Sequence, residues 1–161
     1  MRWSLISSTR SGQRAHPPDC YCIFMVPVGC CLLFLDPEVA PRSELLLVLA
    51  VIARSRLIAM IESVRGLACV KEIARATTRL EALMFGAADM SADLGAETAW
   101  EPLLYTRSRL VAACALAGVP ALDAPFFDVH DSEGLKQEIT RSRALGFSGK
   151  CAINPTQIAV S

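Results

Sequence analysis

Two carboxylates that each follow a short apolar run have the chemistry to hold a divalent cation. Glu62 comes directly after Leu57–Ile61, and Asp89 comes shortly after Phe85. Hard oxygen ligands that leave room for water and substrate oxygens suit Mg²⁺ better than zinc. A lone Glu after a strand is more often a solvated loop residue or a helix cap, and Asp93 has the simpler interpretation of a charge near a helix end. The magnesium interpretation therefore depends on whether the fold brings Glu62 and Asp89 together.

The segment between the two carboxylates indicates how they would meet. Residues 66–79 carry a helical pattern, so the order along the chain is strand, helix, strand. The apolar side chains on one side of this pattern are Leu67, Val70, Ile73 and Ala74. Such a unit has parallel strands, about 4.8 Å apart, joined by a right-handed crossover. We therefore expect Glu62 and Asp89 at the same edge of a sheet, within reach of one ion.

The turn at residues 85–89 has a second use. Its small residues leave backbone N–H groups open to an anionic oxygen. The alternative is a tight strand-to-helix turn that only requires a glycine at Gly86.

Further elements extend the same alternation. Strands are expected near 57–62, 80–86, 120–124 and 149–153, and helices over Ser43–Ala53, Leu103–Ala117 and Ser132–Leu145. In the last helix, Leu135, Ile139 and Ala144 are expected to face inward. The order predicts an α/β fold with a parallel sheet. A doubly wound sheet is the alternative, although no glycine-rich dinucleotide-binding turn is present.

Composition narrows the class of protein. The chain of 161 residues is 53% hydrophobic and 20% charged, which is typical of one apolar globular domain. Its 16 basic and 16 acidic side chains cancel, so no charge imbalance favours nucleic acid. The 7 cysteines include no C-x-x-C pair, and neither histidine completes a zinc-ligand spacing. Buried, reduced thiols in a cytoplasmic protein are the simplest interpretation.

Residues 1–39 differ from the remainder. A polar, arginine-containing start leads into the uncharged run Cys20–Leu35, which Pro27 and Gly29 interrupt. A signal peptide or membrane anchor is one interpretation, although the run is short for a bilayer. The preferred interpretation is a segment that is not native to the fold, offers no convincing strands, and precedes a domain over residues 40–161.

The residues also resemble a known family in matching order and spacing. The blocks that carry the resemblance are LIAMIES, RLEALMFGAAD with SADLG, LLYTRSRLV, AGVPALDAPFFDVHDSEGL and ALGFSGKCAINPTQI. They are similar to the HpcH/HpaI aldolase and citrate lyase beta-subunit family, which includes malyl-CoA lyases and other CoA-ester lyases. The resemblance implies a partial (β/α)₈ TIM barrel, with the four expected strands as strands five to eight. Motifs of the first three strands are not recognised, so a truncated fragment is expected.

The resemblance also assigns roles. Glu62 and Asp89 match the family's magnesium ligands, Gly86 and Ala87 match positions that contact the substrate, and Asp123 matches a substrate-side or structural carboxylate. Ala88 replaces an acid that the family commonly has. Arg107 and Arg109 are read as solvated helix charges rather than contacts to a CoA phosphate, and His130 is not adopted as a base.

The implied reaction is Mg²⁺-dependent carbon–carbon lysis of a CoA thioester of a hydroxy acid, of the citryl-, malyl- or citramalyl-CoA type. The substrate is an acyl-CoA or a small 2-hydroxy or 2-oxo acid. The full-length members of the family are expected to be homo-oligomers, and no nucleic-acid or membrane partner is expected. No catalytic acid–base residue is recognised, so impaired activity is expected. The alternative is a non-catalytic remnant or pseudogene product that retains only metal or carboxylate binding.

Overall fold

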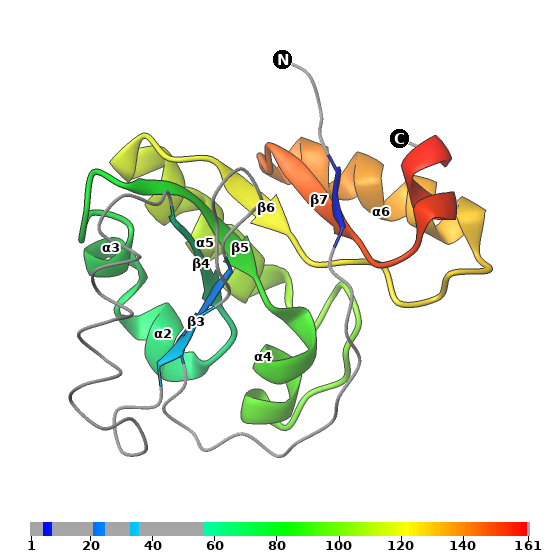
Figure 1. Cartoon of the computed structure of the whole chain (residues 1–161). Helices are drawn as coiled ribbons and strands as arrows, with labels where there is room; N and C mark the ends of the chain where they lie inside the picture. Colours follow the sequence, from blue (N-terminus) through cyan, green and yellow to red (C-terminus); the bar gives the residue numbers. More distant parts are fainter. Residues whose placement is uncertain (1–4, 8–20, 25–32, 36–56, 161) are drawn as a thin grey trace.

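A seven-stranded sheet organises the molecule. The computed structural model describes residues 5–7, 21–24, 33–35 and 57–160 (Figure 1). The strands are β1 (Leu5–Ser7), β2 (Tyr21–Phe24), β3 (Leu33–Leu35), β4 (Leu57–Ile61), β5 (Leu80–Phe85), β6 (Ala121–Asp123) and β7 (Gly149–Ala152). Their order across the sheet is β1-β7-β6-β5-β4-β2-β3.

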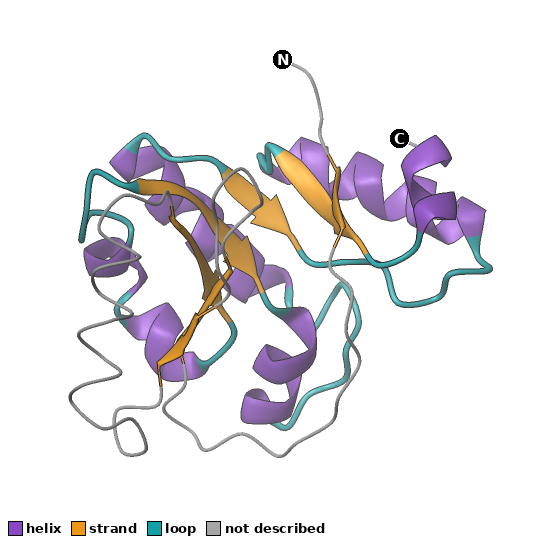
Figure 2. Ribbon diagram, viewed as in Figure 1, coloured by secondary structure: helices purple, strands orange, loops and turns teal. Residues whose placement is uncertain are grey.

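Helices connect the central strands (Figure 2). They are α2 (Val64–Ala68), α3 (Val70–Ile73), α4 (Ala87–Leu94), α5 (Leu104–Ala117) and α6 (Ser132–Leu145), followed by the 3₁₀ helix η1 (Pro155–Val160). Helices α4, α5 and α6 each end at a glycine in the left-handed conformation.

Strands β4, β5, β6 and β7 are parallel and lie side by side in chain order. Each helical connection therefore moves the chain one strand further in the same direction. A doubly wound sheet reverses direction at a switch point, whereas a barrel does not. This order confirms the α/β prediction and favours the barrel type of winding. At the far edge β1 pairs in parallel with β7, the relation that first and last strands have in a closed barrel.

Two expectations about secondary structure were wrong. The single helix predicted over residues 66–79 is divided into α2 and α3, because Cys69 has φ −97° and ψ 13° and interrupts the helical geometry. Strands β1, β2 and β3 also lie in the segment where none was expected. Strand β2 pairs antiparallel with β4 and β3, so apolar residues from this segment supply hydrogen bonds to an otherwise open sheet edge. The helix expected over Ser43–Ala53 lies outside the described residues.

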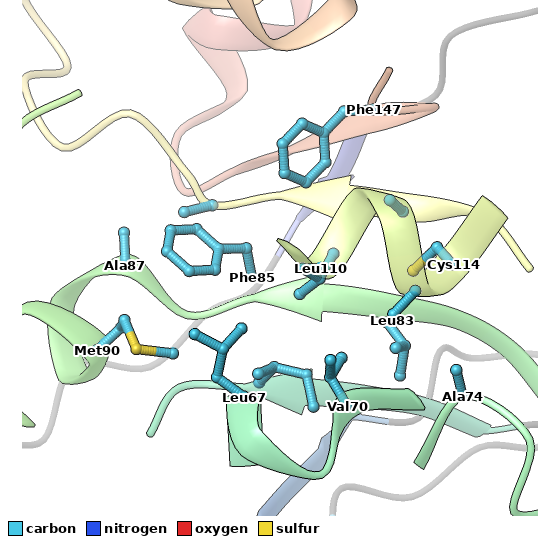
Figure 3. Close-up of a cluster of buried hydrophobic side chains, with 14 of the residues drawn as sticks. Leu67, Val70, Ala74, Leu83, Phe85, Ala87, Met90, Leu110, Cys114 and Phe147 are labelled. Carbon is cyan, nitrogen blue, oxygen red and sulfur yellow. The ribbon is translucent and has the colours of Figure 1, made fainter. Parts of the chain in front are cut away.

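Alternation along the strands separates two apolar layers. The helix-side layer, between the strands and the helices, contains Leu57, Ile61, Leu83 and Phe85 from β4 and β5, with Leu67, Val70, Met90 and Leu110 from the helices (Figure 3). The far-side layer, on the other face of the sheet, contains Ile58, Ala82, Met84, Leu122 and Cys151, with Met60 packed against it. A residue's place in this alternation decides whether it faces the helices or the far side.

The interrupted crossover still buries the face that the sequence indicated. Leu67, Val70 and Ala74 are buried and Ile73 is half-buried. In α6, Leu135 is buried and Ile139 half-buried, but Ala144 is exposed, and Ser142 occupies the inward position instead. Ser142 faces inward because its hydroxyl has a buried acceptor on β6.

None of the helices in the described part of the chain is long and apolar enough to cross a membrane. The run Cys20–Leu35 contributes β2 and β3, and its middle, residues 25–32, is outside the described part.

Candidate functional site

Glu62 and Gly86 meet at the carboxyl edge of the sheet. The register pairs Ile61 with Phe85, so the next residue of each strand lies beside the other, and the Gly86 amide donates to the Ile61 carbonyl at 3.0 Å. A β-carbon at position 86 would lie 2.5 Å from Cβ of Glu62 and 3.2 Å from its Oε2. It would also lie 3.0 Å from Sδ of Met60, which belongs to the far side. The buried Glu62 side chain therefore lies over the start of the turn.

Asp89 is the last residue of the same turn, residues 85–89. It lies in the first turn of α4, whose N-cap is Gly86, and its side chain is exposed. The Met90 amide donates to the Gly86 carbonyl at 3.1 Å, which joins the start of this helix to the strand end. The fold thus brings Glu62 and the segment carrying Asp89 to one edge, as the strand–helix–strand pattern predicted. Metal binding by the two carboxylates stays a prediction.

The side chain of Asp93 bonds to the backbone of another helix. Its Oδ2 accepts a hydrogen bond of 2.6 Å from the backbone amide of Val64, the first residue of α2. This contact satisfies a helix N-terminal amide and ties α2 to α4. It agrees with the lower rank that the sequence gave Asp93 as a metal ligand.

The amides of the turn are not equivalent. The Gly86 amide is occupied by Ile61, and Gly86 caps α4 without a side-chain hydrogen bond. Its φ of −97° is open to any residue, so glycine is required here by the close approach of Glu62 and not by backbone conformation. Any amide donor for a substrate carboxylate would then come from Ala87 or the residue after it.

Asp123 is fully buried on the helix side of β6. Its Oδ1 accepts from Nε of Arg107 at 3.0 Å, and its Oδ2 accepts from Nζ of Lys150 at 2.9 Å and Oγ of Ser142 at 2.5 Å. Burial alone would raise the pKa of the Asp123 carboxyl, but Lys150 and Arg107 outweigh burial and hold this pKa below its usual value. Both oxygens are therefore committed to α5, α6 and β7. Of the two roles expected for Asp123, the structural one accounts for these contacts. Direct contact of Asp123 with a substrate stays a prediction.

Lys150 extends this buried cluster. Its Nζ also donates to the Ala124 carbonyl at 2.7 Å and to Oε1 of Glu138. The ammonium thus has three oxygen partners in place of water, which is what a buried charge requires.

The sequence analysis did not foresee this cluster. Arg107 was expected to be solvated, and this was wrong, because only 3% of the residue is exposed. The spacing carried a signal: residues 103, 107, 110 and 114 fall on one helical face, and the other three are apolar. A lone arginine on a buried face implies a buried acid, and Asp123 on the next strand is that acid. Arg109 is half-buried and donates to the Ala68 carbonyl at 3.3 Å.

The sequence also raised a histidine and the cysteines as candidate functional residues. His130 is exposed, and its amide donates to Asp128 at 2.9 Å. Cys69, Cys114 and Cys151 are free thiols, and Cys114 and Cys151 are buried as expected. Cys69 is exposed, contrary to that expectation, because it joins α2 to α3 on their outer side.

The described residues contain no group of three or more His, Cys, Asp or Glu side chains that would enclose a metal ion by themselves. Glu62 and Asp89 offer carboxylate oxygens, and this donor type fits Mg²⁺, which keeps waters and shares oxygens with its substrate.

Comparison with known protein families gives one family match. The model of HpcH/HpaI aldolase/citrate lyase matches residues 8–155 of the chain. The match begins inside the N-terminal segment that the sequence analysis left unassigned.

Comparison with curated proteins gives relatives of related chemistry. The L-malyl-CoA/beta-methylmalyl-CoA lyase of Cereibacter sphaeroides (strain ATCC 17025 / ATH 2.4.3) is 37% identical over 121 residues. The match covers 63% of this chain and 38% of that enzyme, so the chain matches well under half the length of this relative.

Solved structures share the fold. RipC from Yersinia pestis is 52% identical, with a TM-score of 0.67 over 76% of this chain and 58% of that one. CitE from Mycobacterium tuberculosis in complex with magnesium, acetoacetate and coenzyme A is 30% identical, with a TM-score of 0.65 over 76% of this chain and 55% of that one.

Proposed function

Because the chain belongs to the HpcH/HpaI aldolase/citrate lyase family, we propose that it carries the magnesium-binding edge of a carbon–carbon lyase. The substrate class is the CoA thioester of a hydroxy acid, of the malyl-, citramalyl- or citryl-CoA type. The names of the relatives support this class: one is a malyl-CoA lyase, and a structural neighbour holds magnesium, a small oxo acid and coenzyme A.

One observation carries the proposal. Glu62 directly follows β4 and lies against Gly86, the residue directly after β5, and Asp89 lies three residues beyond Gly86 in the first turn of α4. Both residues follow adjacent parallel strands at the carboxyl edge, where barrel enzymes place their chemistry. The donor type fits Mg²⁺.

Different residues of this chain would bind the metal ion and the substrate. Glu62 and Asp89 would hold Mg²⁺, and the Ala87 amide at the start of α4 would donate to the substrate carboxylate. Bound Mg²⁺ supplies Lewis acidity that draws charge onto a substrate oxygen. Asp123 would have a structural role, since its contacts fix α5, α6 and β7 relative to β6.

The proposed reaction is the cleavage of one carbon–carbon bond of the substrate. In malyl-CoA the hydroxyl loses a proton, and the bond between the carbinol carbon and the carbon beside the thioester breaks. The electron pair passes to the thioester fragment, which takes up a proton. The products are glyoxylate and acetyl-CoA. We assign no acid–base residue for these proton transfers among the described residues.

The proposal is tested by titrating the full chain with MgCl₂ in a calorimeter. Wild type is expected to bind one ion, and Asp89→Asn is expected to lose that binding while keeping its far-UV spectrum. Asp93→Asn is the matched control, because Asp93 bonds to the amide of Val64. It should bind Mg²⁺ as wild type does, although it melts at a lower temperature.

Retained Mg²⁺ binding in Asp89→Asn would overturn the metal assignment, and loss in Asp93→Asn alone would move the assignment to Asp93. Release of acetyl-CoA from malyl-CoA tests the reaction itself. Mg²⁺ binding without any release would favour the binding-only alternative.

A further inference from the structure

A single guanidinium lies between two aromatic rings. The Arg107 guanidinium carbon is 4.9 Å from the centroid of the Phe85 ring and 4.7 Å from that of Trp100. Both separations are within the range of a favourable cation–π contact, and such contacts are strongest where the cation is out of water. Arg107 is buried, so the contacts with Phe85 and Trp100 are of this stronger kind.

The two rings come from opposite ends of one segment. Phe85 is the last residue of β5 and directly precedes Gly86, while Trp100 lies in the connection between α4 and α5. Residues 86–99 therefore leave the sheet at one ring and return at the other. This segment contains α4 and, in its first turn, Asp89.

Arg107 is itself held in place by the buried carboxylate of Asp123. Its Nε donates to Asp123, which also accepts bonds from Lys150 and Ser142. Within the described structure its buried Nη1 has no hydrogen-bond partner. Nε and the two ring faces therefore determine where the guanidinium lies, and a planar group is needed to contact both rings at once.

We propose that Arg107 is a positioning residue that clamps both ends of the α4 segment and so holds Asp89 in place opposite Glu62. The clamp is a property of this fold, while its effect on metal binding rests on the proposed function. Arg107 touches neither the metal nor the substrate in this scheme. It acts through Phe85 on the turn and through Trp100 on the return of the chain.

The test compares Arg107→Lys with wild type in the full chain. Lysine keeps the positive charge beside Asp123 but lacks a flat face for both rings. Hydrogen exchange is measured at the amides of Met90, Gly95 and Ala96, whose acceptors lie within the clamped segment. Exchange at these amides should become several-fold faster, while the amide of Val119 at the end of α5 keeps its rate.

The second readout is MgCl₂ affinity, which should fall by on the order of 10–100-fold, as expected when a group supporting a metal ligand is lost. Trp100→Leu removes one ring but none of the side chains that bond to Asp123, and it should give the same pattern, which covers the case in which Arg107→Lys fails to fold. Arg141→Lys is the control. Arg141 is 5.9 Å from the same ring but is exposed and pairs with Glu101, so its replacement should change neither readout.

Unchanged exchange at Met90, Gly95 and Ala96 in Arg107→Lys and Trp100→Leu would overturn the clamp. Faster exchange with an unchanged Mg²⁺ affinity would overturn the link from the clamp to Asp89 while leaving the proposed function in place. If wild type binds no Mg²⁺, the proposed metal site fails, and hydrogen exchange alone still decides whether the clamp exists.

Discussion

Gly86 lies so close to Glu62 that a β-carbon at position 86 would stand 2.5 Å from the β-carbon of the glutamate. Side-chain carbons do not approach to this distance, so an alanine there would force the Glu62 side chain or the backbone of the turn to move. The glycine is thus in contact with a residue of the proposed metal site, although its own amide is bonded to Ile61.

Gly86→Ala should therefore weaken Mg²⁺ binding by on the order of 10–100-fold, because Glu62 is displaced. It should also destabilise the fold by about 1–3 kcal/mol through overpacking. Calorimetric titration and thermal melts measure the two effects. Gly95→Ala is the control: φ there is 64° and nothing lies within 4 Å of an added β-carbon. It should cost about 1 kcal/mol of stability without changing Mg²⁺ affinity.

The thiols should differ in reactivity. Burial raises the pKa of Cys114 and of Cys151 to about 12, whereas Cys69 is exposed. The thiolate is the reactive form, so at pH 8 the two buried thiols are almost wholly protonated as well as shielded. Among these three thiols, iodoacetamide at pH 8 should therefore label Cys69 first, and Cys114 and Cys151 only in urea. Peptide mass spectrometry checks this, and early labelling of Cys151 would contradict its burial.

Much of the fold was predictable because it depends on local patterns. The apolar runs that became β4 and β5, and the helical pattern between them, predicted the parallel order and the common edge of Glu62 and Asp89. The division of the crossover into α2 and α3 was not predictable, since the apolar face continues through Cys69 and only its backbone angles interrupt the helix.

The buried cluster marks where sequence reasoning was insufficient. Asp123 was recognised as important, but its partners Arg107, Ser142 and Lys150 come from three elements. Pattern rules treat charged side chains as solvated, and the cost of burying one is recovered only when opposite charges meet in three dimensions. The arginine among apolar positions in α5 was the one available hint.

The hydroxyl of Ser142 should contribute more to stability than an ordinary helix serine. It is buried and donates to the ionised Asp123 at 2.5 Å. Hydrogen bonds to charged groups contribute about 1.5–3 kcal/mol, so Ser142→Ala should lower the free energy of unfolding by about that amount. Thr140→Ala is the control on the same helix, because Thr140 is exposed and its hydroxyl bonds only to the Lys136 carbonyl. Equal costs for the two variants in urea titrations would contradict the special role of Ser142.

Asp123→Asn should be the most destabilising of these changes and the most dependent on pH. At neutral pH it leaves two buried cations, Lys150 and Arg107, without their shared carboxylate, which typically costs about 3–5 kcal/mol. Because the pKa of Asp123 is lowered in the folded state, the contribution of this carboxylate to the free energy of unfolding is fully present above the pKa of an unfolded aspartate, about 3.9. It is lost as the pH falls from there through the lowered folded pKa. The difference in melting temperature between wild type and Asp123→Asn should therefore be constant from pH 7 to about pH 5 and shrink below about pH 4. A difference that grows on acidification would mean that the carboxyl is neutral in the folded protein.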